Sequence, residues 1–163
     1  YYYVNKNDVE AATAMANDMI TNAPDNKASW YIKGCVDLNL KKDYVAAREA
    51  FDKSLQIDPN FVEANVNMAY AYMNEVRAHI MDGKYKYAGT SSTNITGKEA
   101  VEVYKKELSE SQEYYKNAMT YMEKVRLLSP DTPKMWAYAL QMIYENLQLK
   151  DKKAEVDAII ESL

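Results

Sequence analysis

Three side chains near the middle of the sequence have the types and spacing of a metal site. Glu75, His79 and Asp82 are four and three residues apart, so an α-helix would place all three on one face. The same spacing arises where a surface histidine lies beside solvated carboxylates. We therefore expect no metal at these residues.

The segment that ends in Gly97 and Lys98 has part of the pattern of a phosphate-binding loop. Ser92 occupies the place of the first glycine, and Glu99 occupies the place of the serine or threonine that follows the lysine. No strand is expected before the segment, although such a loop requires one. The pattern does not match, and we expect no cofactor.

Three glutamates are close enough in sequence to be considered as paired catalytic carboxylates. Glu107, Glu110 and Glu113 have lysines beside them, as on the salt-bridged outer face of a helix. Cys35 is the single cysteine, so an internal disulfide and a cysteine-rich metal site are both excluded. The sequence predicts no catalytic residues, and we expect the protein not to be an enzyme.

Composition indicates one helical domain. A chain of 163 residues, 48% hydrophobic and 27% charged, is long enough for a continuous core. With four glycines, four prolines and no sustained Val/Ile/Thr alternation, the sequence predicts an all-α fold. A net charge of −4 disfavours nucleic acid, anionic membrane surfaces and acidic partners. No apolar run reaches the roughly 18 to 20 residues that span a bilayer, so we expect no membrane insertion.

Prolines divide the chain into similar lengths. Pro24 and Pro59 are 35 residues apart, and Pro130 follows 71 residues later, close to one further unit plus an insertion. Before each proline, small or apolar residues recur at i, i+4 and i+7, the stripe of a buried helix face. These residues are Ala12, Ala16 and Met19, then Ala47, Phe51 and Ser54, then Ala118, Met122 and Val125. A two-helix unit with a period near 34 is the tetratricopeptide signature, and the chain resembles that family.

The first helix of the 28–60 unit carries the family's Trp and Gly positions at Trp30 and Gly34. Lys33 stands where the family usually has leucine. Trp30 and Gly34 also fit a register that differs by one residue from the register set by the following proline. We therefore expect one extra residue in the segment 40–43.

The resemblance implies a superhelix of stacked helix pairs in a single domain. The expected units are 1–25 (partial repeat), 28–60 (repeat), 61–130 (repeat with an insertion at about 76–112) and 131–163 (repeat and capping helix). Asn60 and Glu63 are predicted to form a capping box at the start of the second complete unit. Residues 1–7 are expected to be the last turn of a helix that begins upstream, so we predict further repeats before Tyr1. A preceding signal peptide or lipid anchor is left open, as is the cellular location.

The insertion in the 61–130 unit predicts a helical hairpin. Apolar residues between Val62 and Ile80, and again between Val101 and Val125, alternate steps of three and four, like the seam of a coiled coil. At 1.5 Å per residue the arms would be about 30 Å and about 45 Å long. The segment 83–97 between them holds three of the four glycines and a Ser/Thr run, and we expect a mobile loop there.

The family's first helices line a concave groove, and fifteen tyrosines in this chain suit such a surface. Packing against the next helix is the alternative for each tyrosine. The family's clamp for a C-terminal carboxylate does not carry over, because Tyr31 and Cys35 stand where its lysine and asparagine would be. The partner-binding residues implied by the resemblance are Tyr31, Tyr70, Asn74, Lys134, Gln141 and Tyr144.

The sequence therefore predicts a non-enzymatic scaffold that binds a protein or peptide in its concave groove. The alternative is a structural or oligomerisation segment of a larger repeat protein, with the hairpin as the interaction surface. The partner's identity is left open, and upstream repeats and self-association are both compatible with the pattern.

Overall fold

A computed structural model describes residues 8–89 and 92–163, so the predicted helix end at residues 1–7 lies outside the described chain. The described residues are helical and contain no strand, in agreement with the predicted all-α fold. The α-helices are α2 (Val9–Asn22), α3 (Lys27–Val36), α4 (Tyr44–Ile57), α5 (Val62–Met81), α6 (Lys98–Leu128), α7 (Ala137–Asn146) and α8 (Lys150–Glu161). Shorter turns are η1 (Asp37–Lys41, π-helical), η2 (Ser92–Asn94, 3₁₀) and η3 (Pro133–Met135, 3₁₀).

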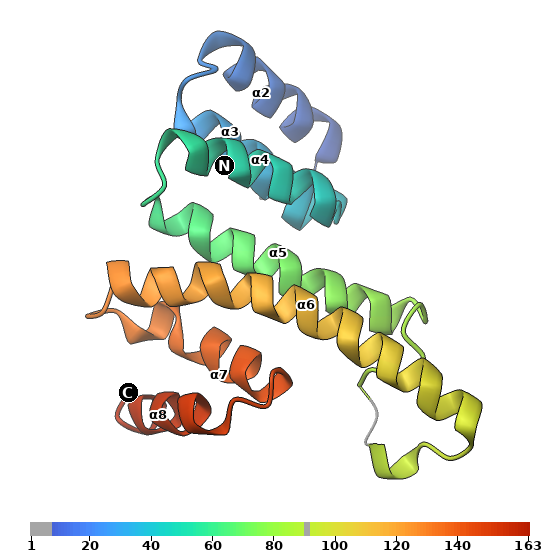
Figure 1. The fold of residues 1–163 in the computed structure, drawn as a ribbon. Coiled ribbons are helices and arrows are strands. Elements are labelled where there is room, and N and C mark those ends of the chain that lie inside the picture. Colours follow the sequence, from blue (N-terminus) through green and yellow to red (C-terminus); the bar gives the residue numbers. More distant parts are fainter. Residues whose placement is uncertain (1–7, 90–91) are drawn as a thin grey trace.

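Each helix packs mainly against the helix before it and the helix after it in the chain, which gives a stack of successive helix pairs (Figure 1). The small residues predicted at the close-packing positions are all fully buried: Ala12, Ala47 and Ala118. Because alanine has a side chain of one carbon, two helix backbones approach closely at these points. No helix in the described ranges is both long and apolar enough to cross a membrane.

Aspartate and asparagine side chains begin three of the helices. Asp8, Asn26 and Asp43 each accept a hydrogen bond from a backbone N–H in the first turn of α2, α3 and α4. The capping box predicted at Asn60 and Glu63 is wrong. The residue at the cap of α5 is Phe61, which makes no side-chain cap bond, and the backbone N–H of Asn60 donates to the Asp58 carboxylate at 3.0 Å.

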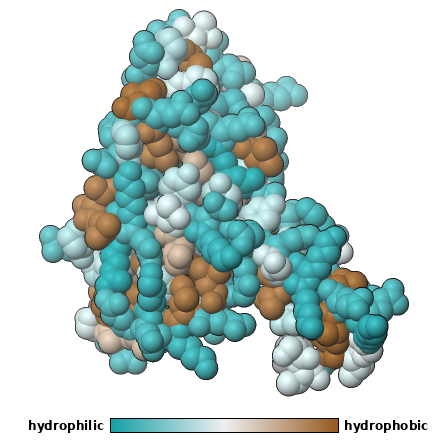
Figure 2. Space-filling view, in the orientation of Figure 1, coloured by the Kyte–Doolittle hydropathy of each residue, from teal (hydrophilic) through white to brown (hydrophobic). Residues whose placement is uncertain are grey.

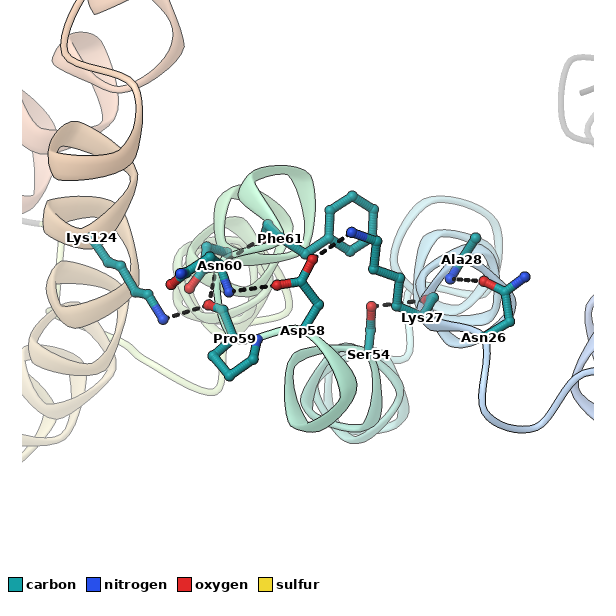
Figure 3. A network of polar contacts seen from close by, with 10 residues as sticks. Asn26, Lys27, Ala28, Ser54, Asp58, Pro59, Asn60, Phe61 and Lys124 are labelled. Atoms are coloured by element: carbon teal, nitrogen blue, oxygen red, sulfur yellow. Dashed lines mark hydrogen bonds and ion pairs between the residues drawn. The ribbon is translucent and has the colours of Figure 1, made fainter.

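A polar network fastens the turn before α5 to its neighbours (Figure 3). Asp58 pairs with Lys27 at the start of α3, and the Ser54 hydroxyl donates to the Lys27 carbonyl at 2.9 Å. On the other side, the Lys124 ammonium of α6 donates to the carbonyl oxygen of Pro59. The turn between α4 and α5 is therefore held by Lys27 from α3 and by Lys124 from α6.

Gly34 is required by the contact between α3 and α4. A Cβ added there would lie 2.4 Å from the ring of Phe51, which is fully buried. Three residues later, the buried carboxylate of Asp37 pairs with Lys33 and Lys41, so the lysine at position 33 neutralises a buried charge. The π-helical turn η1 holds one residue more than an α-helical turn, so the extra residue expected at 40–43 is accommodated mainly just before that segment.

The predicted helical hairpin is present. α5 has 20 residues and α6 has 31, which correspond to lengths of about 30 Å and about 46 Å. The two helices pack side by side, and the hairpin end extends beyond the stack of the other helices (Figure 1).

The segment between the hairpin arms is anchored to α6, which the sequence interpretation missed. Glu107, 6% exposed, accepts hydrogen bonds from the backbone N–H groups of Lys86, Tyr87 and Ala88 at 2.8, 2.7 and 3.0 Å. Tyr85 is buried, and burial raises its pKa to about 12. The expected solvated Glu107 is thus wrong, and residues 85–88 are a packed segment rather than the free loop that the glycines indicated.

Candidate protein-binding surface

Tyr31 joins α3 to α5. Its ring centroid lies 5.1 Å from that of Phe61 and 6.0 Å from that of Phe51, and its hydroxyl accepts a hydrogen bond from the Asn67 amide at 3.2 Å. The same amide lies 3.3 Å from the Cys35 sulfur, and burial raises the pKa of both Tyr31 and Cys35. Tyr31 therefore presents only part of its surface, with its polar group already bonded.

Two predicted residues of α5 lie one turn apart on its solvent-facing side. Tyr70 is 37% exposed. Asn74, four residues later, lines a hollow of about 510 Å³ together with Arg77 and Met81 of the same helix and Tyr44 of α4. A partner side chain would find both an aromatic surface and an amide here.

The solvent-exposed side of η3 and α7 carries large apolar residues that the sequence interpretation did not assign to binding. Met135, Tyr138 and Met142 are 40%, 54% and 50% exposed. Of the predicted residues in this region, Lys134 is exposed, while the Gln141 amide donates to Asp157 at 2.8 Å. Met135, Tyr138 and Met142 are three and four residues apart, a spacing that indicates one face of a helix. The sequence interpretation assigned only the more continuous apolar stripe of the core-facing side.

Tyr144 is not on this surface. Its side chain is 1% exposed, packed in the core that α5, α6, α7 and α8 share, and its hydroxyl donates to Glu123 at 3.0 Å. The prediction that Tyr144 contacts a partner is therefore corrected: the residue is a core group with a bonded hydroxyl.

Replacing Tyr144 with phenylalanine is expected to lower the free energy of unfolding by about 1.5 kcal/mol, because one hydrogen bond to a carboxylate is lost while Lys152 still pairs with Glu123. Urea denaturation measures the change. Partner affinity should stay the same, in contrast to substitutions at Tyr138. A loss of affinity in a stably folded Tyr144→Phe protein would show that the hydroxyl takes part in binding.

Glu75 and His79, two of the residues considered for a metal, belong to a polar cluster in the second half of α5. Glu75 pairs with Arg48 of α4 and accepts a hydrogen bond from the Tyr114 hydroxyl of α6 at 3.3 Å. His79 Nε2 lies 3.7 Å from Glu75 and 2.9 Å from the Lys84 ammonium, and burial together with that ammonium lowers the pKa of His79. No group of three or more histidine, cysteine or acidic side chains in the described ranges is arranged to hold a metal ion.

These features define an all-helical chain of consecutively packed helices with exposed apolar side chains on α5 and α7, a class suited to binding other proteins. No family model matches the chain. The chain is similar to the anaphase-promoting complex subunit CDC27 of Saccharomyces cerevisiae, with 35% identity over 72 residues. The matched region is 44% of this chain and 8% of the length of that subunit. Similarity to a subunit of a multiprotein complex is compatible with a tetratricopeptide-like fold and with a role in protein interaction.

Proposed function

We propose that this chain is a non-enzymatic interaction module of the tetratricopeptide type, which binds a segment of a partner protein across α5 and α7. The observation that carries the proposal is the exposure of Tyr70 on α5, of Met135 in η3, and of Tyr138 and Met142 on α7. The repeat pattern of the sequence would make α5 and α7 the first helices of their units. In the superhelix of that family, first helices line the same concave side.

The chemistry of these residues indicates the kind of segment that they would bind. Methionine adapts to irregular apolar shapes, and tyrosine offers a large surface with few rotatable bonds, so both are effective at interfaces. Asn74 would supply an amide for backbone groups of the partner, and Gln141, whose NH₂ group donates to Asp157, would supply its carbonyl oxygen. The surface would therefore suit a segment that carries apolar or aromatic side chains.

Tyr31 and Lys134 belong to the edges of the proposed surface. Tyr31 would contact the partner with the exposed part of its ring, while Lys134 is exposed beside Met135. The similarity to a subunit of a protein complex supports a scaffold role over catalysis.

A photo-crosslinking residue placed at Tyr138 is expected to form a covalent adduct with one partner protein in the cells that make this chain. Leu127, 81% exposed at the end of α6, is the matched control position and should give no such adduct. Replacing both Tyr138 and Met142 with alanine should weaken binding of the captured partner by about ten-fold or more, since large apolar contacts dominate interface energy. Equal crosslinking from Leu127, or unchanged affinity in a folded double variant, would contradict the proposal.

A further inference from the structure

The hairpin tip, defined as residues 83–89 and 92–106, has a charge opposite to that of the chain. It contains five lysines and two glutamates, a net charge of +3, whereas the whole chain has −4, so the remainder carries −7. All seven charged side chains are exposed. The lysines are Lys84, Lys86, Lys98, Lys105 and Lys106.

Four of these lysines lack a carboxylate partner within the described chain. Lys106 pairs with Glu110 at 3.8 Å, and the Lys84 ammonium lies beside the His79 ring. Lys86 lies over the Tyr87 ring, 5.1 Å from its centroid, while Lys98 and Lys105 form no ion pair with a described residue. These ammonium groups are therefore available to an external anion.

Acidic side chains border the tip, since Asp82 directly precedes it and the Glu107 carboxylate is bonded to the backbone N–H groups of residues 86–88. The core that α6 shares with α7 lies farther away. Lys98 lies seventeen residues before Tyr115, where α6 enters the core shared with α7, which corresponds to about 26 Å along the helix. Charges on a protein surface are largely screened beyond about 8 Å at physiological salt. The attraction of the tip for an anion therefore rests on its four lysines without a carboxylate partner in the described chain, and not on the net charge of the whole chain.

The tip also has a defined shape. A hollow of about 430 Å³ opens between the segment that Glu107 anchors and the first turns of α6. Lys86 and Tyr87 line one side, and the other side includes Lys98, Glu99, Ala100 and Val103. Because Glu107 already fixes the backbone of residues 86–88, a ligand would not have to order this side of the hollow itself.

We propose that the hairpin tip binds an acidic segment of a partner protein, with a carboxylate between Lys86 and Lys98 and apolar contact to Tyr87 and Val103. This surface is separate from the one on α5 and α7. A short peptide would contact the tip alone. A longer polyanion such as a nucleic acid would also be repelled by the rest of the chain, which carries a net charge of −7.

The test is fluorescence anisotropy of a labelled peptide of about ten alternating aspartates and glutamates, titrated with the full chain. The peptide is expected to bind, binding should weaken on raising sodium chloride from about 50 mM to about 300 mM, and the matched Asn/Gln peptide should not bind. Replacing both Lys86 and Lys98 with glutamate should weaken binding at least about ten-fold.

The matched control is Lys53→Glu with Lys150→Glu, two exposed lysines without an ion pair in the described ranges, which changes the net charge by the same amount. This control should retain the affinity of the original chain within about two-fold. Equal losses in the two double variants would indicate a general charge effect and overturn the proposal. No peptide binding by the original chain, or tighter binding of a single-stranded oligonucleotide of equal charge, would overturn it as well. Alanine variants at Tyr138 and Met142 should leave peptide binding unchanged.

Discussion

Replacing Glu107 with alanine is expected to release residues 85–88 from α6 and to speed hydrogen exchange of the amides at 86–88 by about 100-fold or more. In the folded protein, one buried carboxylate accepts hydrogen bonds from all three of those backbone N–H groups. Hydrogen bonds to a charged group contribute about 1.5 to 3 kcal/mol each, and loss of the acceptor leaves three donors without a partner at once. Exchange measured residue by residue reports this local opening directly.

The matched control for this experiment is Glu102→Ala, which removes an exposed carboxylate from the same helix. Its effect on exchange at residues 86–88 should be slight. Glu107→Gln should fall between the two, since a glutamine side chain keeps one acceptor oxygen but turns an NH₂ group toward the remaining donors. If exchange at 86–88 were the same in the original chain and in Glu107→Ala, the anchoring role of Glu107 would be wrong.

Replacing Glu75 with alanine is expected to lower the free energy of unfolding by about 3 to 5 kcal/mol, because Arg48 is left as an uncompensated, largely buried charge. The Arg48 and Glu75 side chains are 17% and 11% exposed. The Arg48 guanidinium lies 4.6 Å from the centre of the Tyr72 ring. Because an aromatic ring covers that side of the guanidinium, little water could reach it after the carboxylate is removed. Urea denaturation followed by circular dichroism measures the change.

Replacing both Arg48 and Glu75 with methionine should recover most of that loss, since two matched apolar side chains leave no buried charge. The exposed pair of Glu113 and Lys116 supplies the control, and Glu113→Ala should change the free energy of unfolding by about 0.5 kcal/mol or less. The single variants Arg48→Met and Glu75→Met complete the comparison. If the double variant lost as much free energy of unfolding as the two single variants together, the buried pair would have no coupling energy.

Local pattern was sufficient to predict much of the architecture. The i, i+4, i+7 stripes at Ala12, Ala47 and Ala118 identified helix faces that the structure buries, and the continued seam after Val62 predicted the long hairpin. These features depend on the helical period, which a single sequence displays directly. The one-residue shift in register after Gly34 was also visible, and η1 accommodates it.

The functions of individual side chains were less predictable, because they depend on contacts between distant segments. Glu107 has lysines around it in sequence and therefore resembled a solvated residue, yet its partners are backbone groups about twenty residues away. Tyr144 fitted a groove position of the family, but a rotation of α7 about its axis decides whether that position faces solvent or Glu123. Met135 and Met142 were missed for the same reason, since the sequence did not show which of two apolar faces of α7 is covered.

α6 is one uninterrupted helix that is shared between the tip and the core of the stack. Its first half carries the lysines of the tip, and its second half packs against α7, which carries Tyr138 and Met142. A load applied by a partner at Lys98 would therefore act on the packing of α7 through a lever arm of about 26 Å. In mechanical terms α5 and α6 form a stiff arm fixed to the stack, and force at its far end becomes torque on the helix that bears the other proposed surface.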